Sequence, residues 1–325
     1  MPTRQAPVHS GFDATTTAKE IMAGRHLSST TAIVTGGYSG LGLEAARMLA
    51  SAGASVIVPA RDVARANGAL QSISGIEVAP LDLMDPDSID AFARTFLATG
   101  KPLHLLLNSA GIMAPPLQRD SRGYESQFST NHLGHYHLAM RVWSALRRAN
   151  GARVVSVSSL GHRLSAVDFE DPNFEQRPYD KWKAYGQSKT ANALFAVEAD
   201  RLGENDGIRA FSLHPGAIFT PLSRHLDLED LRRVGAVDAD GKILSTEQAG
   251  FKTVEQGAAT LLWCATSPQL DGLGGVYCEN CDVASVTTSN EERGGVRPWA
   301  VDPGMAQQLW DLSRRLTGAQ PGVAS

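Results

Sequence analysis

Cysteine is scarce in this sequence, with three residues among 325. Cys278 and Cys281, in "YCENCDVA", have the close spacing of redox and zinc motifs. A zinc site needs further ligands, however, and Cys264 is the one thiol left. We therefore predict that the cysteines have structural roles and stay free, as a reducing cytoplasmic location allows.

Long apolar runs and an excess of one charge are also missing. No run approaches the roughly 20 apolar residues that span a bilayer. Residues 1–29 carry Asp13 and Glu20 before any apolar run, unlike a secretory signal or a membrane anchor. The 30 basic and 34 acidic residues are interspersed and give a net charge of −4. We expect neither nucleic acid nor a membrane as a partner.

Short apolar runs alternate with helical stretches from Thr31 onward. "TAIVTG", "ASVIVPA", "IEVAPLDL" and "LHLLLNSAG" resemble strands separated by helix-length connections, and "ARVVSVSS", "IRAFSLHPG" and "GGVYC" continue the series. This alternation predicts right-handed βαβ units. We expect an α/β fold with a single Rossmann-type, doubly wound domain, in which about seven parallel strands have helices on both faces.

We assign residues 30–290 to this domain, between an N-terminal extension (1–29) and a C-terminal extension (291–325). Two polar, irregular stretches, 161–183 and 222–252, interrupt the alternation. We expect them to be surface insertions beside the carboxyl ends of strands, where ligands bind in open α/β sheets.

Three helices outside the simple alternation are also predicted. "TTTAKEIMAG" is typical of a short helix with Thr16 or Thr17 as its N-cap and Gly24 just past its end. A long helix is expected from about Tyr124 to Ala149, and another near the C-terminus, packed on the outside.

A glycine-rich turn follows the first predicted strand. "TGGYSGLG" contains Gly36, Gly40 and Gly42 in the pattern Gly-x-x-x-Gly-x-Gly. Gly36 permits a tight turn, Gly40 lets the backbone approach a pyrophosphate, and Gly42 lets the next helix pack close to the sheet. The set alone is compatible with a simple tight turn, but its place in a βαβ series favours nucleotide binding.

A phenol and an ammonium share one helix face in "AYGQSKTAN". Tyr185 and Lys189 are four residues apart, so both side chains project from the same side of the predicted helix. Because Tyr and Lys are common, this spacing also arises by chance, and its meaning depends on the other motifs.

Further motifs occur in a fixed order: "LDL" at 81–83, "NSAG" at 108–111, "STNHLGHYHL" at 129–138, "VVSVSS" at 154–159, "YGQSK" at 185–189 and "HPG" at 214–216. With the glycine turn, they resemble the short-chain dehydrogenase/reductase family. "FEDPNFE" and "AYGQSKTANALF" are similar to its retinol-dehydrogenase-like and WW-domain-oxidoreductase-like branch. The resemblance implies an NAD(P)-dependent enzyme that interconverts carbonyls and alcohols, without fixing the substrate.

The resemblance also implies where the dinucleotide binds. It assigns the cofactor to Gly36, Ser39, Gly40, Leu41, Gly42, Arg61, Asp82, Leu83, Asn108, Ala110, Gly111, Tyr185, Lys189, Pro215, Gly216, Ile218 and Thr220. NAD enzymes usually carry an acidic residue at the end of the second strand, where this chain has Ala60 followed by Arg61. We therefore favour NADP(H) over NAD(H). The alternative is that Arg61 pairs with Asp62 or solvent.

Hydride transfer to a carbonyl leaves negative charge on oxygen, so the site needs a proton donor and a hydrogen-bond donor. The resemblance assigns these roles to Tyr185 and Ser159, with Ser158 as the alternative to Ser159. Lys189 and the oxidised nicotinamide are together expected to lower the pKa of Tyr185, and Lys189 is also expected to hold the nicotinamide ribose. Asn131 is expected to anchor a water for proton relay, or else to cap the long helix.

Several other functions were weighed. His132, His135 and His137 have offsets that do not converge on one ion, so we predict no metal. Phe174, Tyr179 and Trp182 line a substrate pocket or pack the insertion on the sheet.

The leading hypothesis is an enzyme acting on a mostly apolar small molecule. The alternative is a catalytically silent dinucleotide-binding sensor or scaffold, and an extended-type epimerase is disfavoured because it usually has Gly-x-x-Gly-x-x-Gly. Relatives suggest a homodimer or homotetramer.

Overall fold

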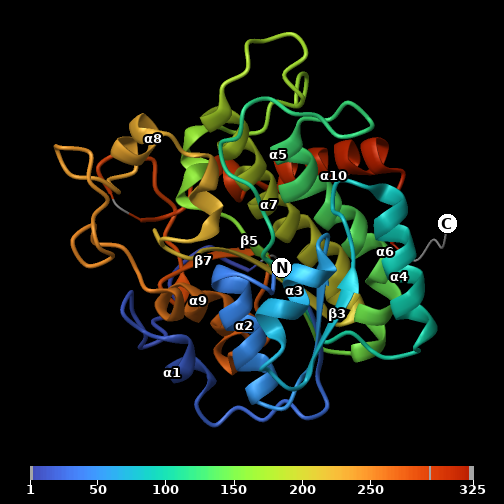
Figure 1. Ribbon diagram of the computed structural model, residues 1–325. Coiled ribbons are helices and arrows are strands. Elements are labelled where there is room, and N and C mark those ends of the chain that lie inside the picture. Colours follow the sequence, from blue (N-terminus) through green and yellow to red (C-terminus); the bar gives the residue numbers. More distant parts are fainter. Residues whose placement is uncertain (1–2, 293, 322–325) are drawn as a thin grey trace.

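The computed structural model describes residues 3–292 and 294–321 (Figure 1). The outermost parts of the predicted extensions, residues 1–2 and 322–325, and residue 293 lie outside the described residues. Within the described chain the strands are β1 (Thr31–Thr35), β2 (Ser55–Ala60), β3 (Ile76–Pro80), β4 (Leu105–Asn108), β5 (Ala152–Val157), β6 (Ile208–His214), β7 (Val276–Glu279) and β8 (Asp282–Val283).

These strands form one sheet in the order β3-β2-β1-β4-β5-β6-β7-β8. The pairs from β3 to β7 are parallel, and β8 runs antiparallel to β7. The predicted doubly wound sheet is therefore confirmed, with β8 as an addition too short to leave an apolar pattern. The chain winds outward from β1 through β2 to β3 and then crosses to β4. Because the winding reverses between β1 and β4, a ligand crevice is expected at their carboxyl ends.

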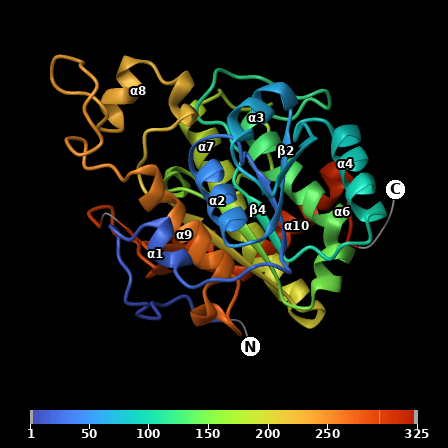
Figure 2. The ribbon, with the colours of Figure 1, turned by 60° about the horizontal axis from the view of Figure 1, so that its bottom comes forward.

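The α-helices of the described chain are α1 (Ala18–Met22), α2 (Gly40–Ser51), α3 (Val63–Leu70), α4 (Pro86–Ala98), α5 (Ser126–Phe128), α6 (Gly134–Ala149), α7 (Lys181–Gly203), α8 (Leu228–Arg233), α9 (Val254–Thr266) and α10 (Pro303–Thr317). α1, α2 and α9 lie on one face of the sheet, while α4 and α6 lie on the other (Figure 2). Successive residues of a strand point to opposite faces of the sheet. Val34 packs in the core on the α1, α2 and α9 side, and Ile33 packs in the core on the α4 and α6 side.

The predicted long helix from Tyr124 to Ala149 is not regular. It begins at Ser126, after Glu125, whose carboxylate accepts from the N–H groups of Gln127 and Phe128 at 2.9 and 2.7 Å. A π-helical turn then covers Ser129–Leu133 before α6 begins. Such turns insert one extra residue into a helix and are frequent at functional sites, and this one contains the predicted Asn131.

The insertions differ in structure. A 3-10 turn, Leu160–Leu164, opens the first one. Helix α7 begins at Lys181, so the last three residues of the predicted 161–183 insertion belong to that helix. The correction has a local cause, because the Asp180 carboxylate caps α7 by accepting from the N–H groups of Trp182 and Lys183. The 222–252 insertion contains α8 and projects from the body of the protein (Figure 1).

The terminal helices are attached by caps and apolar contacts. Thr17, one of the two predicted caps, forms a capping box with Glu20 at the start of α1. Helix α10 packs against α7 and buries Leu309 and Leu312. Among the residues that the structure describes, no helix combines the length and apolar character needed to cross a bilayer.

The three cysteines are buried and unbridged. They all belong to the core on the α9 side of the sheet. The Cys281 thiol lies 3.7 Å from the Thr260 hydroxyl, and burial raises the pKa of Cys281 to about 12. A buried thiol with a raised pKa is a poor nucleophile, which agrees with a structural role.

Candidate active site

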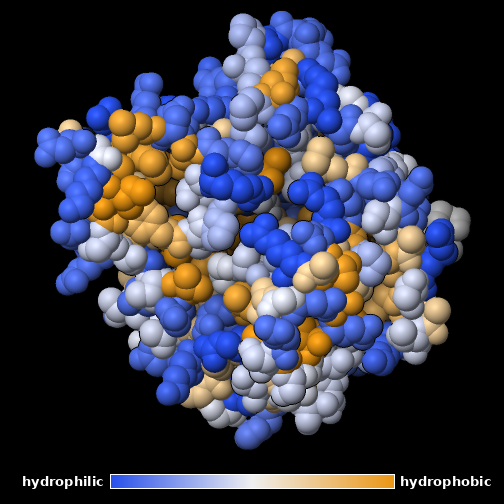
Figure 3. Space-filling view, viewed as in Figure 1, coloured by the Kyte–Doolittle hydropathy of each residue, from blue (hydrophilic) through white to orange (hydrophobic). Residues whose placement is uncertain are grey.

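A cleft with a volume of about 850 Å³ opens at the carboxyl ends of the central strands. Its floor includes the glycine-rich turn after β1, and its far end includes the segments after β5 and β6. Figure 3 shows a hollow on this face, next to apolar side chains in the region of α8. The cleft therefore lies at the carboxyl ends of β1 and β4, where the direction of winding reverses.

The glycine-rich turn allows very close backbone approach. Gly36 has φ +68°, and a Cβ on it would lie 3.0 Å from the Cα of Ala110. A Cβ on Gly42 would lie 2.4 Å from the carbonyl oxygen of Gly36. Gly40, with φ +51°, starts α2 after the N-cap Ser39. The turn is thus a smooth backbone cradle at a helix N-terminus, and it fits the pyrophosphate of a dinucleotide.

The loop after β4 is held by a residue that the sequence analysis did not identify. Thr35 Oγ1 accepts from the N–H groups of Ser109 and Ala110 at 2.9 and 3.0 Å. The same hydroxyl lies 2.9 Å from Nε2 of His135. Asn108 instead turns into the sheet, where its Nδ2 donates to Ser156 Oγ at 3.3 Å. In the sequence, the signal for this role is a threonine at the end of the first strand, and a threonine at such a position is not specific for it.

Most predicted cofactor residues line the cleft: Gly36, Ser39, Gly40, Leu41, Gly42, Arg61, Asp82, Leu83, Ala110, Gly111, Tyr185, Lys189, Pro215, Gly216, Ile218 and Thr220. Asn108 is the exception, because it is buried behind this surface. Arg61 is exposed at the end of β2. Asp62 caps α3 by accepting from the N–H of Arg65 at 3.0 Å, and no ion pair joins it to Arg61 in the described chain.

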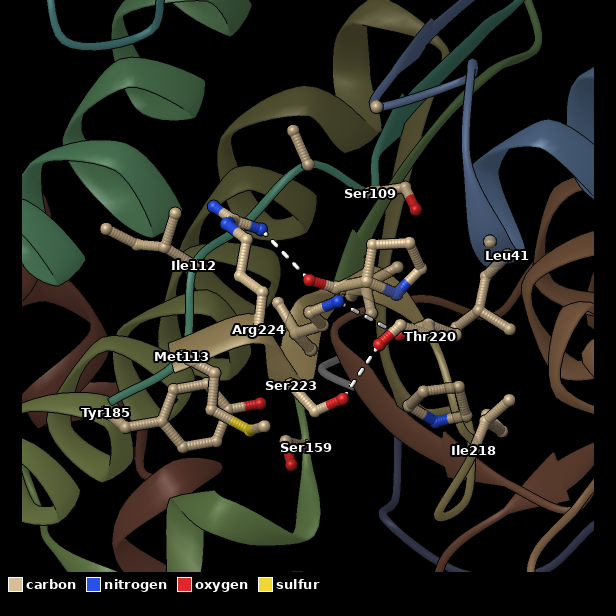
Figure 4. A pocket seen from close by; sticks show the side chains of 18 of the residues that line it. Leu41, Ser109, Ile112, Met113, Ser159, Tyr185, Ile218, Thr220, Ser223 and Arg224 are labelled. Carbon is tan, nitrogen blue, oxygen red and sulfur yellow. Dashed lines mark hydrogen bonds between the residues drawn. The ribbon is translucent and has the colours of Figure 1, made fainter. Parts of the chain in front are cut away.

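Ser159, Tyr185 and Lys189 all line the cleft. Figure 4 shows the side chains of Ser159 and Tyr185 near each other at one end of it. Tyr185 and Lys189 both lie on α7 and are 4% and 3% exposed. Lys189 Nζ lies 5.6 Å from the centroid of the Tyr185 ring and donates to the carbonyl of Val157 at 3.0 Å. The predicted face-sharing of this pair is therefore observed.

The structure also separates the two candidate serines. Ser158 donates its hydroxyl to the backbone oxygen of Lys189 at 2.6 Å. Ser159 Oγ accepts from the N–H of Gly161 at 3.0 Å and hydrogen-bonds to the Tyr185 side chain. Ser159 is thus the serine whose hydroxyl faces the phenol.

Within the protein chain alone, the pKa of Tyr185 is raised rather than lowered. Burial raises the pKa of Tyr185 to about 12, and the Ser159 hydrogen bond opposes this shift. Burial also lowers the pKa of Lys189 to about 8. The physical reason is that desolvation disfavours the charged form of each group. The lowering expected from Lys189 and the oxidised nicotinamide together stays a prediction.

Asn131 lies behind the cleft in the π-helical turn and is fully buried. Its Oδ1 accepts from the N–H of Ile112 at 2.9 Å, and its Nδ2 donates to Ile112 O and Ser188 Oγ at 3.0 and 2.9 Å. It is therefore not the helix cap, which is Glu125. A Cβ on Gly111 would lie 3.1 Å from Asn131 Oδ1 and 3.6 Å from Lys189 Nζ, so these groups are neighbours.

The three histidines near Asn131 point to separate partners. His132 Nε2 lies 2.7 Å from Ser313 Oγ, and His137 Nε2 lies 2.8 Å from Asp90 Oδ1. His135 bridges the carbonyl of Asn131 and the Thr35 hydroxyl, both at 2.9 Å. Their rings act as buried hydrogen-bonding groups rather than as one ligand set.

Beyond Tyr185, the cleft is lined mainly by apolar residues. Trp182 packs edge-on against the Tyr185 ring, with centroids 6.3 Å apart, and Met113 and Leu226 join this cluster. The Arg233 guanidinium lies 5.6 Å from the centre of the Trp182 ring. Of the three aromatic residues considered from sequence, Trp182 lines the cleft.

The other two aromatic residues pack within the insertion. The rings of Phe174 and Tyr179 contact each other with centroids 5.3 Å apart. The Tyr179 hydroxyl accepts a hydrogen bond from Nε2 of Gln127 and donates one to Oε1 of Glu125. This is the packing role that the sequence left open for them.

Comparison with known proteins agrees with this geometry. The model of the family described as short chain dehydrogenase matches residues 30–230. A probable oxidoreductase from Streptomyces lividans is 44% identical over 292 residues, which cover 88% of this chain and 96% of that protein. The WW domain-containing oxidoreductase of Danio rerio is 37% identical over 319 residues, which cover 94% of this chain and 72% of that protein.

A solved structure is also similar over most of its length. An uncharacterized protein from Mycobacterium paratuberculosis matches with a TM-score of 0.71 and 33% identity, covering 93% of this chain and 98% of that one. The family match spans more than half of the sequence, and the relatives match nearly all of it. The chain therefore belongs to the short-chain dehydrogenase family, whose members are oxidoreductases that use a nicotinamide dinucleotide and small-molecule substrates.

Proposed function

We propose that the protein is an NADP(H)-dependent oxidoreductase that interconverts a carbonyl and an alcohol on a mostly apolar small molecule. The observation that carries the proposal is the meeting of Ser159, Tyr185 and Lys189 at one end of a cleft whose other end is a glycine cradle. The apolar wall around Trp182 and Met113 supports an apolar substrate body.

The proposed roles follow from the contacts of each residue. The nicotinamide, when bound, supplies or accepts the hydride. Tyr185 has its pKa raised by burial to about 12, so it is protonated near neutral pH and serves as the acid in carbonyl reduction. Ser159 hydrogen-bonds to the same phenol and orients the substrate oxygen. Lys189, buried under the Tyr185 ring, stabilises negative charge on the phenolate in the reverse direction.

Asn131 completes the proposed set as a support for proton exchange. It fixes the loop at Ile112 and borders Gly111 and Lys189, where a relay water is proposed. The preference for NADP(H) rests on Ala60 and Arg61 at the end of β2, because a guanidinium binds a 2′-phosphate and no carboxylate there repels it.

The direct test is turnover of NADPH by the purified protein with a panel of apolar ketones and aldehydes. Tyr185→Phe removes the proton donor and should abolish most of kcat. Tyr124→Phe is a matched control, because its hydroxyl bonds Leu316 O at 3.2 Å, outside the cleft. If Tyr185→Phe kept wild-type kcat, the proposed mechanism would be wrong.

A catalytically silent dinucleotide sensor or scaffold is the second candidate. Tight NADPH binding without turnover on the full panel would favour it. The presence of Asn131, Ser159, Tyr185 and Lys189 argues against it, because a pure binder has no chemical need for all four side chains. The cytoplasmic location and the homodimer or homotetramer remain predictions from the sequence.

A further inference from the structure

We infer that His162 is a positioning residue for Ser159, and that it connects the active site to the C-terminal segment around Arg297. This inference rests on the proposed oxidoreductase function, in which Ser159 orients the substrate oxygen. His162 lies three residues after Ser159 in the 3-10 turn that follows β5. It is fully buried and does not line the cleft.

Both ring nitrogens of His162 have definite partners. Nδ1 lies 2.7 Å from the carbonyl oxygen of Ser159. Nε2 accepts a hydrogen bond from the backbone N–H of Arg297 at 3.1 Å. Because a carbonyl can only accept and a backbone N–H can only donate, the two contacts specify the neutral ring with its proton on Nδ1. The imidazole is therefore a fixed bridge between Arg297 and Ser159.

The surroundings hold this bridge in place. The ring lies against Tyr277 of β7, with centroids 5.0 Å apart and the Tyr277 hydroxyl 3.2 Å from Nδ1. The His162 carbonyl accepts from Thr190 Oγ1 at 3.0 Å and from Trp299 Nε1 at 3.3 Å. The neighbouring residue Arg163 donates to the carbonyls of Glu292 and Gly294. The turn is thus attached to α7 on one side and to residues 292, 294, 297 and 299 on the other.

The same turn supports the reacting side chains. The Gly161 N–H donates to Ser159 Oγ at 3.0 Å. A Cβ on Gly161 would lie 2.7 Å from Cε1 of Tyr185, so the backbone of the turn lies against the phenol ring. A shift of the turn would therefore move the serine hydroxyl relative to the phenol. Residues 294–299, which lie outside the 30–230 family match, hold the imidazole through the N–H of Arg297, and the bond of Nδ1 to Ser159 O in turn holds the serine backbone.

Two conservative variants separate the two hydrogen bonds. In His162→Asn, the amide Nδ2 takes the place of Nδ1 and keeps the bond to Ser159 O. In His162→Gln, the longer side chain places Oε1 near the Nε2 position and keeps the bond from the Arg297 N–H. Thr190→Val is the control for general loosening, because it removes bonds to His162 O and Ser165 O without touching the imidazole.

We expect His162→Gln to lower kcat by about 10²-fold, as for a misplacement of roughly 1 Å, with the Kd for NADPH unchanged. His162→Asn should keep a larger share of kcat, and Thr190→Val should lower Tm without a matching loss of kcat. Equal losses of kcat in the Asn and Gln variants, or a loss in Thr190→Val as large as in His162→Gln, would overturn the positioning role.

Two measurements do not depend on turnover. Crystal structures should show Ser159 displaced from Tyr185 in His162→Gln and in place in His162→Asn; an unmoved serine in the Gln variant contradicts the inference. Nitrogen NMR of the wild-type protein should show the Nδ1-protonated ring of His162, and the other tautomer would also overturn it. If Ser159 moves as expected but the wild type turns over no substrate, the proposed function fails and the positioning role stands.

Discussion

The indole Nε1 of Trp182 donates to Oδ1 of Asp230 at 2.9 Å. This bond joins α7, which carries Tyr185, to α8 in the 222–252 insertion. The other carboxylate oxygen of Asp230 accepts from Lys181 Nζ at 2.5 Å. Asp230 is 4% exposed, so a nearly buried carboxylate attaches the insertion to α7.

We predict that Trp182→Phe, which keeps an aromatic ring but removes the donor, weakens substrate binding. A hydrogen bond to a charged group contributes about 1.5–3 kcal/mol, so KM for an apolar carbonyl substrate should rise about tenfold or more. Steady-state kinetics at saturating NADPH measures this. The Kd for NADPH is the internal control, because Trp182 is not among the residues assigned to the cofactor. An unchanged KM would show that the bond does not shape the substrate site.

Cofactor preference should depend on Arg61. Arg61→Ala removes the only side chain proposed to bind the 2′-phosphate, and the loss of a charge-assisted bond predicts an increase of about 10-fold to 100-fold in KM for NADPH. KM for NADH should stay close to the wild-type value. Arg65→Ala, an exposed arginine on α3, is the matched control. Equal effects on both dinucleotides would contradict the assignment of NADP(H).

Because Gly161 lies against the Tyr185 ring, adding one methyl group at position 161 should reduce activity. In Gly161→Ala, the new Cβ would lie 2.7 and 2.9 Å from two carbons of the Tyr185 ring. The ring must move, and kcat should fall by about 10²-fold. Gly68→Ala is the control, because its Cβ would meet nothing within 4 Å. A wild-type kcat in Gly161→Ala would mean that the phenol position is not critical.

Stability should fall in acid because of buried neutral histidines. Burial lowers the pKa of His135 to about 4 from an ordinary value of 6.5. The unfolded chain therefore binds this proton more readily, and the free energy of unfolding should decrease as pH falls from about 6.5 to about 4. The loss from His135 alone is about 3 kcal/mol. His162, with its pKa lowered to about 4 by burial, acts in the same window.

Urea denaturation at several pH values between 4 and 8 checks this prediction. His135→Gln should show a shallower decrease of the unfolding free energy than the wild type over that range. The exposed His26→Gln exchange is the matched control. A stability that is flat from pH 8 to pH 4 would show that the buried rings are protonated without cost.

Features set by local pattern could be predicted from the sequence. Three features depend mainly on residues close together in the sequence: the alternation of strands and helices, the glycine-rich turn, and the Tyr185–Lys189 pair. Each is found at the position that the residue spacing predicts. The π-helical turn could not be predicted, because an extra residue in a helix depends on how Asn131 meets Ile112 from another segment.

Contacts between residues far apart in the sequence explain why other features of the site could not be predicted. Thr35 and His135 are 100 residues apart, and Trp182 and Asp230 are 48 apart, so no local pattern links them. The pKa of Tyr185 depended on burial, which is a property of the whole fold rather than of its helix.

The bond between His162 and the backbone of Arg297 has a consequence for biosynthesis. Residues 30–230, which match the family model, are synthesised first, and Arg297, the partner of His162, is added about 70 residues later. At roughly 5–20 residues per second, the nascent chain carries all its reactive groups for several seconds before the turn that aligns them is secured. On the proposed role of His162, the turn after Ser159 therefore acquires its full support only once the last tenth of the chain has been synthesised.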